Sequence, residues 1–148
     1  MLTWKEYQLA TEQLKKKMSV FDGCYDSSHY TLTELVSTIR SVMPIDYVRE
    51  KFIYVEKPIS YASGFCALNS YTIYNLTGGD KYWEYYNISP KNGFYEYVKY
   101  LRNKKNGEYL YLGDIPNIPY NLGRPITQEF RCPNAELYVA LIKKLSHN

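Results

Sequence analysis

Tyrosine is the residue type that most limits how this chain can fold, because it accounts for 18 of the 148 residues. Burying a tyrosine ring is favourable, but a buried phenol hydroxyl needs a hydrogen-bond partner. So many phenols cannot all lie in the core of a small protein with their hydroxyls bonded. We therefore expect some tyrosines in the core and a surface on which others remain accessible.

The composition is otherwise that of a globular protein. Hydrophobic residues make up 45% of the chain and charged residues 22%, which excludes a disordered or fibrous protein. A chain of this length can bury a core of its own. We find no internal repeat, low-complexity stretch or Gly/Ser-rich linker, so residues 1–148 are interpreted as a single domain.

From the sequence we expect neither a secretion signal nor a membrane-spanning segment. The N-terminal residues Met1–Glu6 include charge almost at once, and no stretch of about 18 apolar residues follows. Cys24, Cys66 and Cys132 are widely spaced and odd in number, which is typical of reduced thiols. We therefore expect a location in the cytoplasm, of the producing cell or of a host, and no membrane partner.

Four helices are predicted from helical periodicity and capping signals. Two of them, Thr3–Met18 and Thr31–Met43, begin with a threonine followed three residues later by a glutamate. A third is predicted to begin at Ser89–Pro90, with apolar residues at helical spacing as far as Leu101, and to be closed by Asn106–Gly107. The fourth begins near Pro133–Asn134, with Leu141 in the middle of its apolar stripe.

Strands are predicted in the middle of the chain, where β-branched and aromatic residues are frequent. They are Lys51–Glu56, a hairpin formed by Ser70–Leu76 and Lys81–Ile88 around a Gly-Gly turn, and Glu108–Leu112. Together with the helices they predict an α+β fold. We expect a small, mainly antiparallel sheet with about four helices packed on it as a single layer.

The predicted hairpin also separates core residues from surface residues. Pairing across the turn places Tyr74 and Trp83 on one face, and the opposite face carries Glu84, which would be costly to bury without a partner. Tyr74 and Trp83 are therefore expected in the core. The opposite face is expected to form an open binding surface that includes Tyr71, Tyr82, Glu84 and Tyr86.

The segment Gly64–Asn69 resembles the nucleophile segment of papain-like viral and deubiquitinating proteases. In that family the cysteine begins a helix whose dipole lowers the thiol pKa. The resemblance implies a cysteine hydrolase with Cys66 as the nucleophile. The family's histidine base usually follows the cysteine, whereas here His29 precedes it and His147 is next to the last residue. Cys66 and His29 are the catalytic candidates, and a buried structural cysteine is the alternative.

Two short strings, Gly93–Tyr95 and Tyr111–Gly113, resemble the two motifs of GIY-YIG nucleases. In that family the motifs lie on adjacent strands, and an arginine and a metal-binding glutamate complete the site. Arg124 and Glu136 are the residues available for those roles. The connection between the strings is longer than the family's, and its first half has helical periodicity.

Metal and cofactor sites are not predicted. Cys24 and His29 have a C-x4-H spacing, but a zinc site needs four convergent ligands and the chain has no Cys-x-x-Cys pair. Phosphate-loop and dinucleotide-binding patterns are also missing from the sequence. We expect neither a metal nor a cofactor.

A small non-enzymatic binding protein is the function that these patterns favour. Tyrosine supplies large, rigid contact area and stacks on nucleobases. Lysine outnumbers arginine 13 to 5, which with many Asn, Ile and Tyr residues is typical of AT-rich phage, virus or mobile-element genes. We expect an accessory or inhibitor protein that recognises a partner protein, a nucleic acid or a nucleotide. A net charge of +3 does not choose among these ligands. A Cys66 hydrolase and a GIY-YIG-like nuclease are the enzymatic alternatives.

Overall fold

The computed structural model describes residues 16, 18–42, 66–94, 97–112, 117–126 and 135–146. Nearly all of the predicted helix Thr3–Met18 and the whole of the predicted strand Lys51–Glu56 lie outside these residues. The described α-helices are α2 (Leu32–Val42), α4 (Cys66–Leu76) and α5 (Ala135–Ser146). The strands are β1 (Trp83–Ile88), β2 (Val98–Asn103), β3 (Tyr109–Leu110) and β4 (Arg124–Pro125).

The four strands form one antiparallel sheet in the order β3-β2-β1-β4. In the β1–β2 register, Glu84 is opposite Arg102 and Tyr86 is opposite Tyr100. Tyr109 of β3 is opposite Arg102 on the other side of β2. Because direct partners point to the same face of a sheet, these five residues share one face.

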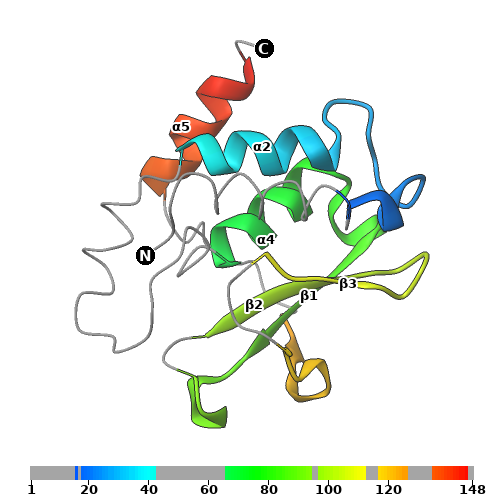
Figure 1. Cartoon of the computed structure of the whole chain (residues 1–148), viewed down its shortest axis with the longest axis vertical. Coiled ribbons are helices and arrows are strands. Elements are labelled where there is room, and N and C mark those ends of the chain that lie inside the picture. The colour runs from blue at the N-terminus through cyan, green and yellow to red at the C-terminus, as the bar shows by residue number, and fades with distance from the viewer. Residues whose placement is uncertain are drawn as a thin grey trace.

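The three helices lie on the other face of the sheet, and α4 packs against β2 and β1 (Figure 1). The main core lies between them and includes Trp83, Tyr85 and Leu101 from the sheet and Leu141 from α5. A smaller cluster on the far face contains Ile88, Val98 and Tyr100, covered by residues that include Ile118 and Tyr120. The mixed α+β architecture and the antiparallel sheet are thus confirmed, with three α-helices in the described part rather than about four.

The predicted hairpin strand Ser70–Leu76 is wrong, because these residues belong to helix α4. Side chains of both odd and even number are buried in α4, including Asn69, Ser70, Thr72 and Ile73. A helix buried on more than one side has no clear apolar stripe, and a short apolar run of this kind cannot be distinguished from a strand by periodicity. The actual hairpin partner of β1 is β2.

The predicted helix from Ser89 through Leu101 is also wrong beyond its first turn. The Ser89 hydroxyl does accept a hydrogen bond from the Lys91 amide, at 3.3 Å, and a 3-10 turn follows over Pro90–Asn92. Gly93 then adopts a φ of 95°, which ends the turn, and the chain continues into β2. The capping signal was therefore correct for one turn.

Two other predicted helices are confirmed close to their expected bounds. At the start of α2 the Thr31 hydroxyl accepts from the Glu34 amide at 3.1 Å. The Glu34 carboxylate in turn accepts from the Thr31 amide at 3.0 Å, which completes a capping box. In α5, Leu141 is fully buried, as expected.

Candidate functional site

The sheet has a cluster of cations and tyrosines at the end where β2 turns into β3. The Lys104 amide donates to the Tyr82 carbonyl at 2.8 Å, which holds this turn beside the residue that precedes β1. The ammonium groups of Lys81 and Lys105 lie 5.6 and 5.3 Å from the centroid of the Tyr82 ring. Cations at such distances are attracted to the electron-rich face of a tyrosine.

Neither of these two ammonium groups forms an ion pair with any residue that the structure describes. The neighbouring Lys104 does, because its Nζ lies 3.3 Å from an Asp80 carboxylate oxygen and also donates to the Asp80 carbonyl. The pKa of the Asp26 carboxyl is lowered mainly by hydrogen bonds from Ser28 and to a smaller extent by the charge of Lys81, so Asp26 offsets part of that charge without forming an ion pair. Lys81 and Lys105 therefore bring positive charge to Tyr82 that no described ion pair neutralises.

Gly78 allows Tyr82 to take this position. It has a φ of 106°, and a Cβ at this residue would lie 2.3 Å from the Tyr82 ring. A larger residue would meet both the left-handed backbone conformation and the tyrosine ring. Tyr82 thus packs directly on the turn that follows α4.

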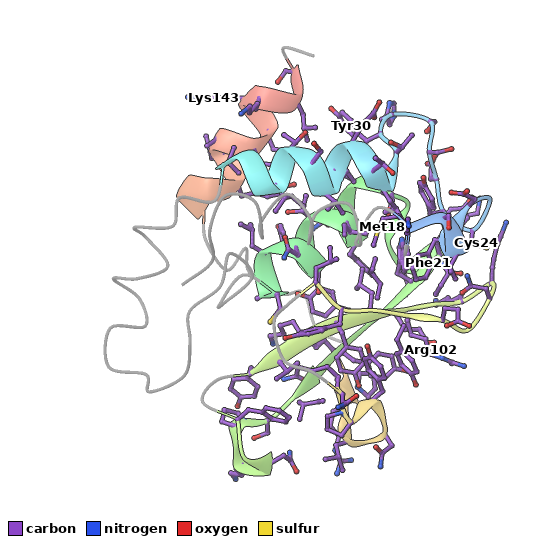
Figure 2. The ribbon with its side chains drawn as sticks, viewed as in Figure 1. Met18, Phe21, Cys24, Tyr30, Arg102 and Lys143 are labelled. Carbon is purple, nitrogen blue, oxygen red and sulfur yellow. The ribbon has the colours of Figure 1, made fainter. Side chains whose placement is uncertain are left out.

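Arg102 and Tyr109 form a second pair of a cation and a ring on the adjacent strands. The guanidinium carbon lies 5.8 Å from the Tyr109 ring centroid, and Nε donates to the Gly107 carbonyl at 3.2 Å. Nη1 donates to a Glu84 oxygen at 3.3 Å, and the other Glu84 oxygen accepts from the Tyr86 hydroxyl at 3.0 Å. Figure 2 shows Arg102 on the side of the sheet away from the helices. We use the name cationic end for Lys81, Tyr82, Arg102, Lys105 and Tyr109.

Four tyrosines of the far face contact one another, and we call Tyr86, Tyr100, Tyr109 and Tyr120 the tyrosine cluster. Tyr86 and Tyr100 are stacked, with centroids 5.5 Å apart. Tyr109 and Tyr120 are stacked at 4.1 Å with an interplanar angle of 2°. Burial raises the pKa of Tyr100 and of Tyr120. The pKa of Tyr86 is raised by burial and by its hydrogen bond to the Glu84 carboxylate, so all three phenols are neutral near pH 7.

The predicted binding residues do not form one platform. Tyr82 belongs to the cationic end, and Glu84 and Tyr86 lie on the far face of the sheet, bonded to each other. Tyr71 lies on α4, where its ring packs edge-to-face on Tyr138 of α5 at 5.2 Å. The predicted common face is therefore wrong, because it assumed a strand where α4 is found.

Of the two residues expected in the core, Trp83 is fully buried and Tyr74 is partly buried. The indole nitrogen of Trp83 donates to the Thr77 hydroxyl at 2.8 Å. Tyr74 contacts the Tyr85 ring edge-to-face at 5.9 Å.

The sequence analysis does not identify Lys81, Arg102, Lys105 and Tyr109 as site residues, although one signal could have found the pairing of Arg102 with Tyr109. The dipeptide Asn106-Gly107 is typical of a hairpin turn. Here it closes the β2–β3 turn, with Gly107 at a φ of 74°. As the end of the predicted third helix, this dipeptide gives no indication that Arg102 pairs with Tyr109.

Cys66 and the segment that leads to His29 are at opposite ends of α4. Cys66 begins α4, and its sulfur accepts from the Lys99 amide at 3.5 Å. The segment leading to His29 is attached at the other end of α4, where the Asp26 amide donates to the Thr77 carbonyl at 3.1 Å. Eleven helical residues span about 16 Å. The structure therefore does not bring the two catalytic candidates together.

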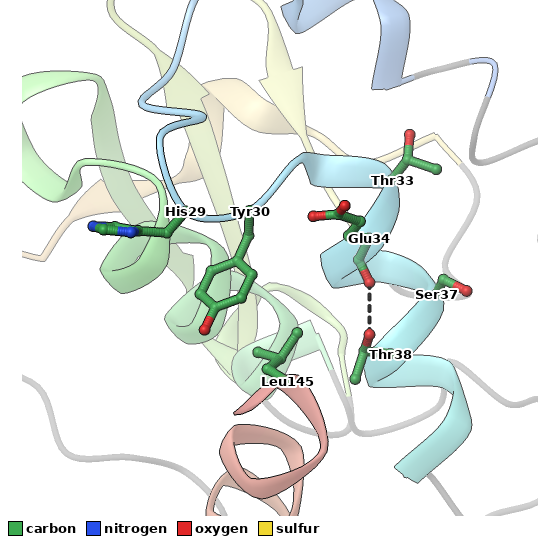
Figure 3. Close-up of a pocket in the computed structure, with 7 residues that line it drawn as sticks. All are labelled: His29, Tyr30, Thr33, Glu34, Ser37, Thr38 and Leu145. Atoms are coloured by element: carbon green, nitrogen blue, oxygen red, sulfur yellow. Dashed lines mark hydrogen bonds between the residues drawn. The ribbon is translucent and has the colours of Figure 1, made fainter. Parts of the chain in front are cut away.

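His29 instead lines a cavity of about 410 Å³ between α2 and the end of α5 (Figure 3). The other lining residues are Tyr30, Thr33, Glu34, Ser37, Thr38 and Leu145. The Glu34 carboxylate is engaged in the capping box, and the Glu34 carbonyl accepts from the Thr38 hydroxyl at 2.8 Å. These polar groups hold the first turns of α2.

The strings that resemble GIY-YIG motifs lie near each other, because Gly93 and Phe94 precede β2, and Tyr111 and Leu112 follow β3. The helix predicted between them is β2. Arg124, however, is on β4, so that β1 and β2 separate it from β3. Glu136 belongs to α5, among the helices on the other side of the sheet.

No set of three or more His, Cys, Asp and Glu side chains able to hold a metal ion occurs among the described residues. Within the same residues, the helices are too short or too polar to cross a membrane. Searches of protein-family models, curated proteins and solved structures find no match to this chain.

Proposed function

We propose that this protein binds nucleic acid without catalysing a reaction, and that the cationic end is the contact surface. The observation that carries the proposal is the pair of ammonium groups at Tyr82, neither of which forms an ion pair with a described carboxylate. Lysines attract phosphates, and tyrosine rings stack on bases whatever their sequence. A surface that combines the two suits single-stranded nucleic acid.

Arg102 has a different role in this proposal from Lys81 and Lys105. Arg102 is engaged by Glu84 and by the Gly107 carbonyl, so it orients Tyr109 more than it attracts phosphate. Lys81 and Lys105 are the groups expected to contact phosphates. With a net charge of +3, the binding should be moderate in strength and sensitive to salt.

The separation of Cys66 from His29 supports a binding protein over a cysteine hydrolase. The position of Arg124 on the opposite sheet edge likewise gives no support to a GIY-YIG-like nuclease. A partner protein is the other ligand class. It is favoured if no oligonucleotide binds.

The test is fluorescence anisotropy with labelled single-stranded DNA and RNA of about 16 nucleotides, the upper site size of one small binding fold. Lys81→Ala with Lys105→Ala should weaken binding about tenfold or more. It should also reduce the slope of log affinity against log salt by about 1.4, since two phosphate contacts are lost. Lys143→Ala with Lys144→Ala removes the same charge from α5 and is the matched control.

The double variant of α5, Cys66→Ala and His29→Ala should all bind like the wild type. An equal loss in the two double-lysine variants would show that net charge, and not the cationic end, determines binding. If the wild type binds neither DNA nor RNA at low salt, the proposal is wrong.

A further inference from the structure

We infer that the Tyr109 ring is a nucleobase subsite and that the Tyr120 ring covers it in the unliganded protein. This inference rests on the proposed nucleic-acid binding and adds a base contact to the phosphate contacts at Lys81 and Lys105. Its starting point is the stacking of Tyr109 and Tyr120 at 4.1 Å and 2°. Stacked aromatic side chains usually have centroids 4.5–7 Å apart, so this pair overlaps closely, as stacked bases do.

The Tyr120 side chain is held more weakly than its backbone. The Tyr120 carbonyl accepts from the Tyr100 hydroxyl at 2.8 Å, and its amide donates to the Ile118 carbonyl at 3.0 Å. The Tyr120 hydroxyl, in contrast, makes no hydrogen bond to any described residue. Rotation about the Cα–Cβ bond would therefore uncover Tyr109 without breaking either backbone hydrogen bond.

The surroundings of Tyr109 suit an incoming base. Tyr109 is already 38% exposed. Tyr100 meets the rings of both Tyr109 and Tyr120 edge-on, at 5.7 and 4.9 Å. Tyr100 would therefore remain as a wall of the subsite after Tyr120 has moved. The Arg102 guanidinium, which is paired with Glu84, lies beside the Tyr109 ring and helps to hold it in place.

The size of the displaced group indicates which base fits. The phenol of Tyr120 has one six-membered ring, as a pyrimidine has, whereas a purine has a second fused ring. A pyrimidine can occupy the place of the Tyr120 ring between Tyr109 and Tyr100. The subsite should therefore favour pyrimidine runs over purine runs of the same length.

The experiment compares oligo-dT with oligo-dA by anisotropy for the wild type, Tyr109→Ala and Tyr120→Ala. Tyr109→Ala should weaken oligo-dT binding roughly 5- to 150-fold, as expected for one stacked base. Tyr120→Ala should strengthen it several-fold, because no ring has to be displaced. The control is Tyr97→Ala, which removes an exposed tyrosine with Lys99 near its ring and should change nothing.

A second readout does not depend on the folding of Tyr120→Ala. Stacking on a tyrosine quenches the fluorescence of 2-aminopurine. A 2-aminopurine within oligo-dT should therefore be quenched strongly by the wild type and by Tyr120→Phe, and clearly less by Tyr109→Leu.

The inference is overturned if Tyr120→Ala weakens binding as Tyr109→Ala does, or if Tyr109 variants bind and quench like the wild type. If the Lys81 and Lys105 variant still loses salt-dependent binding in that case, the proposed function stands and the subsite alone is wrong. If the wild type binds no oligonucleotide, both the proposed function and the subsite are wrong.

Discussion

The phenol of Tyr100 is fully buried, and its hydroxyl donates a hydrogen bond to one backbone carbonyl, that of Tyr120. The hydroxyl can reach this carbonyl because Gly123 leaves the space open: a Cβ on Gly123 would lie 1.6 Å from the Tyr100 oxygen. A glycine is therefore required here by close approach and not by its backbone angles. Burial of this neutral, bonded hydroxyl raises the Tyr100 pKa.

The raised pKa of Tyr100 predicts a loss of stability in alkali. An unfolded tyrosine ionises near pH 10, whereas folded Tyr100 stays neutral to higher pH. The unfolded state therefore loses its proton first, so stability is complete below about pH 10 and falls as pH rises above it. Tyr100→Phe cannot ionise and should make this fall less steep, by up to about 1.4 kcal/mol per pH unit.

The measurement is urea unfolding between pH 8 and pH 11. Tyr97→Phe, which changes an exposed tyrosine, should keep the wild-type pH dependence. Equal slopes for the two phenylalanine variants would contradict the role of Tyr100.

Among the elements, α2 begins at the residue that the sequence predicts, because the capping box gives the Thr31 and Glu34 amides hydrogen-bond partners within the same segment. Thr31→Ala removes the oxygen that accepts from the Glu34 amide and should lower the free energy of unfolding by about 0.5–2 kcal/mol. Thr33→Ala, an exposed threonine of the same helix, is the matched control and should change it by less than about 0.5 kcal/mol. Chemical denaturation measures both, and equal losses would argue against the cap.

The elements that were mispredicted share a physical cause. In α4 and β2, the tertiary contacts of the segment, and not its local sequence signals, determine whether it forms a helix or a strand. Ser89 caps a turn as expected, but Val98 and Tyr100 then pair with β1, which overrides the helical spacing of the same residues. Local capping was predictable from the sequence, whereas the tertiary partners of aromatic residues were not.

At the scale of the whole molecule, Trp83 joins three parts of the chain. It lies on β1, its indole nitrogen bonds Thr77 after α4, and its ring lies 5.4 Å from that of Phe21. Trp83→Ala should therefore lower the free energy of unfolding by about 3–5 kcal/mol. Trp83→Phe keeps a ring and loses the N–H donor, so it should cost less. Thermal melting tests both variants. An unchanged melting temperature for Trp83→Ala would contradict the assignment of Trp83 to the core.

The candidate site could be predicted from the sequence in part. The alternation of β1 correctly separates Trp83 from Glu84 and Tyr86. The cationic end could not be found in the same way, because Tyr82 and Lys105 are distant in sequence and meet only through the pairing of β1 with β2. Residues on one strand are related by period, whereas residues on different strands are related by register.

Asn103 in β2 has a consequence for how the protein is made. Its side-chain amide donates to the Cys24 carbonyl at 2.8 Å, across 79 residues of sequence, and its oxygen accepts from the Lys105 and Asn106 amides. At ribosomal speeds of about 5–20 residues per second, the Asn103 amide appears about 4–16 s after Cys24. Residues 19–26 must wait through that interval without this anchor, although they are among the first of the described residues to leave the ribosome.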